Sequence, residues 1–116
     1  GAIYMNKENL LVVSFDIILH SGNARTMLHE AFELMREGEF LEAEKKLDDA
    51  NNELMEAHKA QTSLLRDYVN GEEIVMEVII VHAEDHLMTT MALREMAVEM
   101  LHVYREMSEL RKLRES

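Results

Sequence analysis

The chain has 116 residues, a net charge of −11, no cysteine and no proline, and its length suits one domain with a core of its own. The negative charge argues against nucleic acid as a partner, because phosphates would be repelled. It suits docking onto basic protein surfaces, or it simply keeps the protein soluble. The absence of cysteine excludes disulfides and thiolate metal sites. Without a signal sequence or an apolar run of about 18 residues, we expect a soluble, cytoplasmic protein.

The composition favours helix, and the first helix is predicted to begin after Asn6 or Asn9, either of which can cap it, and to end at Gly38. We interpret residues 1–4, ahead of Met5, as a remnant of an expression vector. Apolar residues at spacings of three and four predict a buried line in this helix, with His20 or Ser21 filling its one gap: Leu10, Val13, Ile17, Ala24, Leu28, Ala31 and Met35.

The second helix is predicted from Glu39–Phe40 to the break at Asn70–Gly71. Gln61 occupies a position that the apolar pattern reserves for the core, and a buried amide without partners costs roughly 1–3 kcal/mol. We therefore expect Gln61 to bond something specific, while His58 lies at the edge of the line. The predicted line is Phe40, Ala43, Leu47, Ala50, Leu54, Ala57, Gln61, Leu64 and Tyr68.

The third helix is predicted to begin at Glu72–Glu73 and to run to the C-terminus. Residues 78–92 are apolar nearly all round, and three helices cannot cover one of their own members so completely. We therefore expect an antiparallel up-down-up three-helix bundle, all-α, that assembles as an oligomer around this helix. Its predicted core-facing line includes both histidines of interest: Val75, Ile79, His82, His86, Thr89, Leu93, Met96, Met100, Val103, Met107 and Leu110.

Three polar residues in the third helix, His82, Asp85 and His86, stand at i, i+3 and i+4, which predicts that they share one face. Such a trio can bind a metal such as zinc, move a proton or carry a phosphoryl group, and the alternative is a buried polar patch. A di-iron bundle needs two Glu-x-x-His pairs, and only Glu99 and His102 form one. Phosphohistidine chemistry fits better, with His82 as the nucleophile and His86 as a second donor.

Residues 81–90 read VHAEDHLMTT, which resembles the active-site segment of the lactose/cellobiose-specific enzyme IIA components of the bacterial sugar phosphotransferase system. Three further pieces match the same family in its order and spacing: SGNAR at 21–25, EGEF at 37–40 and EAHKAQT at 56–62. The resemblance extends from about residue 10 to residue 110, so that it covers nearly the whole chain.

The resemblance implies a homotrimer in which His82 accepts a phosphoryl group from the histidine phosphocarrier protein and passes it to the cognate IIB component. This relay serves uptake of a lactose/cellobiose-type disaccharide through the membrane IIC permease. By the same resemblance Asp85 lies on the threefold axis and binds one divalent metal ion per trimer, and the chemistry of a carboxylate cage suits Mg²⁺. His86, His58 and Gln61 form the polar shell of the phosphorylation site.

One departure from the family pattern concerns Glu84, which also belongs to this shell and stands where the family commonly has glutamine. The Glu84 carboxylate lies within two residues of His82, which must carry a dianionic phosphoryl group. A negative charge so close can change the rate of phosphoryl transfer and the stability of the phosphohistidine. This departure leaves a second functional class open, in which the protein is a non-catalytic helical bundle for regulation or interaction with a vestigial site.

Overall fold

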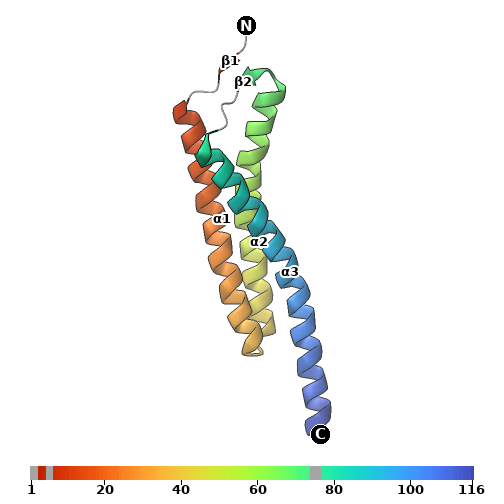
Figure 1. The fold of residues 1–116 in the computed structure, drawn as a ribbon. Coiled ribbons are helices and arrows are strands. Elements are labelled where there is room, and N and C mark those ends of the chain that lie inside the picture. The colour runs from red at the N-terminus through yellow and green to blue at the C-terminus, as the bar shows by residue number, and fades with distance from the viewer. Residues whose placement is uncertain (1–2, 5–6, 74–76) are drawn as a thin grey trace.

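The computed structural model of the chain contains three long helices joined by two short connections (Figure 1). Helix α1 spans Lys7–Arg36, α2 spans Phe40–Val69 and α3 spans Val78–Glu115. Two-residue strands β1 (Ile3–Tyr4) and β2 (Glu72–Glu73) pair in parallel. The structure describes residues 3–4, 7–73 and 77–116.

The helices form an elongated bundle that measures 74 × 20 × 19 Å. In Figure 1 the chain descends along α1, returns along α2 beside it and descends again along α3. The blue C-terminal end of α3 extends beyond the turn between α1 and α2. An all-helical fold is therefore confirmed, with the short strand pair as its one addition. Within the described ranges, no helix has both the length and the apolar character that crossing a membrane requires.

Glycine ends the first helix as the sequence predicts. Gly38 has φ +79°, its N–H donates to the carbonyl of Met35 at 3.1 Å, and the N–H of Glu39 donates to that of Leu34 at 2.9 Å. A left-handed residue at this position lets the last free carbonyls of a helix be satisfied. The second connection also has a left-handed glycine, Gly71, with φ +94°.

The predicted helix starts agree with the structure only in part. Helix α1 begins at Lys7, as the start after Asn6 predicts, whereas the start after Asn9 is wrong; Asn6 itself lies outside the described residues. The start of the third helix at Glu72–Glu73 is also wrong, because these residues pair with β1 and α3 begins only at Val78. A two-residue strand is too short to leave a periodic signal in the sequence.

The predicted lines of α1 and α2 supply most of the core. Ser21 fills the gap in the α1 line, and Ser14 is buried where Val13 was expected, with its hydroxyl donating to the carbonyl of Leu10 at 2.7 Å. Frequent alanines let the two helices approach closely, because interaxial distance depends on side-chain size. The buried apolar residues of α1 and α2 are Leu10, Ile17, Ala24, Leu28, Ala31, Met35, Ala43, Leu47, Ala50, Leu54, Ala57 and Leu64.

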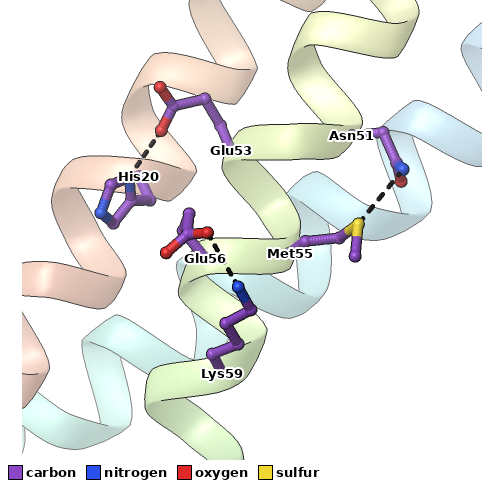
Figure 2. Close-up of polar contacts among 6 residues, drawn as sticks. All are labelled: His20, Asn51, Glu53, Met55, Glu56 and Lys59. Carbon is purple, nitrogen blue, oxygen red and sulfur yellow. Dashed lines mark hydrogen bonds and ion pairs between the residues drawn. The ribbon is translucent and has the colours of Figure 1, made fainter.

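A polar contact accompanies this packing at the edge of the core. Nδ1 of His20 lies 2.5 Å from Oε2 of Glu53, so the ring points from α1 toward α2 (Figure 2). Farther along α2, Lys59 donates to Glu56 at 3.1 Å on the exposed surface. An exposed pair of this kind contributes only about 0–1 kcal/mol, so apolar burial dominates the α1–α2 association.

The core-facing line of α3 lies one position away from the predicted line, which is therefore wrong. His82 is exposed and His86 half-buried, while Val75 lies outside the described residues. Because α3 is apolar on several sides, periodicity alone could not select the inward side. The true line mixes large apolar side chains with small ones, and its buried members are Ile80, Ala83, Leu87, Thr90, Ala97 and Leu101.

Candidate functional site

Two stacked imidazoles form the centre of the candidate site. The rings of His82 and His86 have centroids 6.2 Å apart and planes within 5° of parallel. One turn of α3 separates the two residues, which places both rings on the same flank of the helix. The exposed ring of His82 is open to a partner protein, whereas the ring of His86 is half-buried. The structure thus brings together the pair that the spacing predicts.

Helix α1 passes close to the inner histidine. A Cβ atom placed on Gly22 would lie 3.8 Å from Nε2 of His86, so the glycine leaves room beside this ring. Partial burial lowers the pKa of His86, and the positive charges of Arg25 and then His82 lower it further. At neutral pH the ring is therefore uncharged, with one nitrogen that donates and one that accepts a hydrogen bond.

Arg25 joins α1 to α3 just below the two histidines. Its Nε donates to Oγ1 of Thr90 at 3.1 Å, and its Nη2 donates to Oγ1 of Thr90 at 2.9 Å and of Thr89 at 2.8 Å. The two hydroxyls donate in turn to backbone carbonyls of the preceding turn. Thr89 reaches the carbonyl of Asp85 at 2.7 Å, and Thr90 that of His86 at 2.6 Å. Arg25 is thereby linked to the turn that carries His86.

The opposite flank of α3 carries a second polar group that faces α2. The amide of Gln61 donates to Oε2 of Glu84 and lies 3.9 Å from Sδ of Met88. The specific partner expected for Gln61 is therefore found. Oε1 of Glu84 is buried, and no described residue forms a hydrogen bond with it. Because the two histidines lie on the flank beside α1, Glu84 and Gln61 do not contact His82 within one chain.

His58 lies farther along α2, away from the stacked pair. This exposed residue lines a cavity of about 230 Å³, and His82 is not among its neighbours there. Arg94 shares this cavity, and its Nε donates to the carbonyl of Leu47 at 3.0 Å. The structure therefore places His58 in a separate, largely apolar hollow, whose other lining residues are Asn51, Leu54, Met55, Met91 and Glu95.

Asp85 is exposed on the side of α3 that faces away from α1 and α2, and its carboxylate contacts neither histidine. The helical spacing of 82, 85 and 86 is as predicted, but among the described residues no contact joins the Asp85 carboxylate to either ring. Across the described part of the chain, no three His, Asp or Glu side chains lie close enough together to hold a metal ion. A metal at Asp85 would need ligands from other chains.

Sequence reasoning did not identify Arg25, Thr89 and Thr90 as parts of this site. The segment 21–25 was singled out for its family resemblance, but nothing in it shows where the arginine points. The one local signal is that Arg25 follows Gly22 by three residues, which puts both on the same side of α1. The contact with α3 depends on the tertiary register of the two helices.

Comparisons with known proteins agree on one family. The family "PTS system, Lactose/Cellobiose specific IIA subunit" matches residues 12–105. A curated relative, the lichenan-specific phosphotransferase enzyme IIA component of Bacillus subtilis, is 42% identical over 107 residues, which make up 92% of this chain and 96% of the relative.

Solved structures extend the similarity to the fold. The crystal structure of PtcA from S. mutans has 59% identity and a TM-score of 0.86, over 87% of this chain and 99% of that one. The IIA(chitobiose)–HPr complex of the Escherichia coli phosphotransferase system shares 30% identity and a TM-score of 0.73, over 85% and 96% of the two chains. The similarity thus covers nearly the whole length of each protein.

Proposed function

The chain belongs to the lactose/cellobiose-specific IIA family of the bacterial sugar phosphotransferase system, and from that premise we propose that His82 is its phosphoryl carrier. As a cytoplasmic relay it accepts the phosphoryl group from the histidine phosphocarrier protein, HPr. It passes the group to the cognate IIB component during disaccharide uptake through the IIC permease. The similar IIA(chitobiose)–HPr complex supports HPr as the donor. The exposed ring of His82, stacked on His86, is the observation that carries the proposal.

The chemistry is an exchange between two imidazoles. The bond from phosphorus to the donor nitrogen breaks and leaves its electron pair on that nitrogen, while the lone pair of a neutral His82 nitrogen forms the new P–N bond. Each ring keeps the proton on its other nitrogen. The donor therefore leaves as a neutral imidazole, His82 becomes a phosphoimidazolium, and the step itself moves no proton.

His86 assists this exchange as a neutral hydrogen-bond partner. Its pKa is lowered first by burial and then by the charge of Arg25, which keeps one ring N–H available without adding a charge. A donor placed beside the ring of His82 stabilises the oxygens of the transferred group where negative charge accumulates. We assign His86 this role and not that of the nucleophile, because it is the more enclosed of the two rings.

We further propose that the subunits are up-down-up bundles that assemble as a homotrimer around α3. The support is an apolar face of α3 that no other part of the described chain covers. Val78 is 85% exposed, Val81 45% and Met88 52%, and the apolar face continues toward the C-terminus. Contiguous apolar surface of this extent marks a protein interface. The later members of the face are Met96, Val103, Met107, Leu110 and Leu113.

Asp85 places a carboxylate in the first part of this apolar face, between Val81 and Met88. In a trimer centred on the face, three Asp85 carboxylates would meet and repel one another unless they were protonated or bound a cation. Carboxylate oxygens are the ligands that hard divalent cations such as Mg²⁺ prefer. We therefore propose one divalent ion per trimer, held by the three copies of Asp85, as a structural charge neutraliser.

A regulatory bundle without transfer activity is the second candidate, and the observation that favours it is Glu84. This residue replaces the usual glutamine, and its buried Oε1 has no partner. Incubation with phosphoenolpyruvate, the general phosphotransferase proteins and this chain, followed by intact-mass measurement, separates the two functions. The carrier predicts a gain of one phosphate per chain, whereas the regulatory bundle predicts an unchanged mass.

A further inference from the structure

Arg25 is a cation for which the described residues provide no anionic partner. Its three hydrogen bonds all go to the neutral hydroxyls of Thr89 and Thr90. No ion pair of Arg25 occurs in the described part of a chain whose net charge is −11. Other cations of this chain do have such partners, among them Lys46 with Glu30, Lys59 with Glu56, Arg105 with Glu44 and Lys112 with Glu109. A half-buried guanidinium held only by neutral groups is suited to receive an anion.

The register of α1 on α3 places this cation below the stacked histidines. Gly22 lies against His86, and Arg25, one turn later on α1, lies against Thr89 and Thr90. Along α3 the order is therefore His82, His86 and then the arginine site. At the level of His86 α1 presents Gly22, so this position adds no side chain in the space beside the His86 ring. A shift of about one helical turn, roughly 5 Å, would bring the guanidinium level with that space.

The site would change little if the guanidinium of Arg25 moved away from Thr89 and Thr90. Each hydroxyl already donates to a backbone carbonyl of α3, at 2.7 Å from Thr89 and 2.6 Å from Thr90, and these bonds do not depend on Arg25. The bonds that Arg25 would give up are to neutral acceptors, whereas a phosphoryl dianion would add the attraction between opposite charges. The planar guanidinium also matches two oxygens of a phosphoryl group at once. A dianion on His82 is therefore a better partner for Arg25 than the two hydroxyls.

We propose that Arg25 is the phosphoryl-binding residue of this site, held on Thr89 and Thr90 until His82 is phosphorylated. When the phosphoryl group arrives, the guanidinium turns past Gly22 and donates to the phosphoryl oxygens. This inference rests on the proposed function and deepens it, because it names the group that compensates the charge of the dianion. Arg25 exchanges no proton, since a guanidinium remains charged throughout.

The test compares Arg25→Gln, which removes the charge, with Arg25→Lys, which keeps it but loses the planar fork. The matched control is Arg94→Gln, because Arg94 is also half-buried and also bonds only a neutral acceptor, the carbonyl of Leu47 at 3.0 Å. Each protein is phosphorylated with phosphoenolpyruvate and the general phosphotransferase proteins. The rate of phosphate gain is measured by intact mass, and the phosphohistidine resonance by ³¹P NMR.

We expect Arg25→Gln to accept phosphate at least about tenfold more slowly than the wild type, the scale of losing one preorganised charge-stabilising group. Arg25→Lys should recover only part of the rate, because it keeps the charge but not the planar fork, and the ³¹P resonance should move in Arg25→Gln but not in Arg94→Gln. A Lys variant as slow as the Gln variant, an unmoved resonance, or a Gln variant as fast as the wild type would overturn the role of Arg25. A wild type that gains no phosphate would overturn the proposed function as well, so the two failures are distinguishable.

Discussion

The imidazole of His86 lies parallel to that of His82, with the ring centroids 6.2 Å apart, and it is the more enclosed of the two. In the proposed mechanism His86 supplies a hydrogen bond and not the reacting nitrogen. We therefore predict that His86→Ala still accepts one phosphate but does so about tenfold more slowly, as expected for loss of one donor. Quenched time courses read by intact mass measure this rate. The control is His58→Ala, which removes an exposed histidine from the separate cavity. Equal rates for His86→Ala and the wild type would reduce His86 to a structural role.

The sequence predicts the core lines of α1 and α2 well because apolar residues at spacings of three and four contrast with mostly polar neighbours, although Phe15 and Leu65 are exposed outside these lines. The lines around Leu28 and Leu47 follow directly from that contrast, and Gln61 stands out because it breaks the pattern. In α3 the contrast is missing. Bulky residues such as Met96 remain exposed in the single chain while Ala97, one position on, is buried. The inward side of α3 is selected by close packing, which hydrophobic periodicity does not encode.

The candidate site was predictable to the extent that it is local. His82 and His86 come together because helix geometry alone places residues four apart side by side. Arg25 could not be placed in the same way, because its contacts with Thr89 and Thr90 span more than sixty residues of sequence and depend on how α1 packs along α3. For the same reason the sequence could not show that Glu84 faces α2.

Assembly around α3 leads to a prediction about Val81, which is 45% exposed in the single chain. We expect the wild type to sediment at three times its mass of 13.5 kDa. Val81→Glu should give monomers, because a charge buried in an apolar interface without a partner is strongly unfavourable. Leu41→Glu is the control, since Leu41 is 79% exposed on α2 and lies outside the proposed interface. A wild type that sediments as a monomer at micromolar concentration would contradict the assembly.

Variants of Asp85 test whether a metal ion neutralises the three carboxylates at the proposed threefold axis. If a divalent ion neutralises three carboxylates there, a chelator at neutral pH should lower the melting temperature of the wild type. Asp85→Asn and Asp85→Leu should show no such response, and the Leu variant should melt higher than the wild type in the presence of chelator, because repelling charges are replaced by apolar groups. Thermal scans at one fixed protein concentration provide the measurement. A chelator effect of equal size in all three proteins would place the metal elsewhere.

Glu84 provides a prediction about stability that is independent of phosphoryl transfer. One of its carboxylate oxygens is buried without a partner while the other accepts from Gln61. Replacing the carboxylate by an amide removes the cost of burying a charge, so Glu84→Gln should raise the free energy of unfolding by about 1 kcal/mol. Urea denaturation at fixed concentration measures this change, with exposed Glu95→Gln on the same helix as the control. A loss of stability in Glu84→Gln alone would show that the carboxylate has a favourable partner in the assembly.

The identity of the phosphorylated residue is the central claim, and intact mass on His82→Ala tests it most directly. The variant is incubated with phosphoenolpyruvate and the general phosphotransferase proteins beside the wild type, with a circular dichroism spectrum to show that both are folded. Because His82 is exposed, its truncation should leave the bundle intact. We predict one added phosphate on the wild type and none on folded His82→Ala. A phosphate retained by His82→Ala would contradict the account.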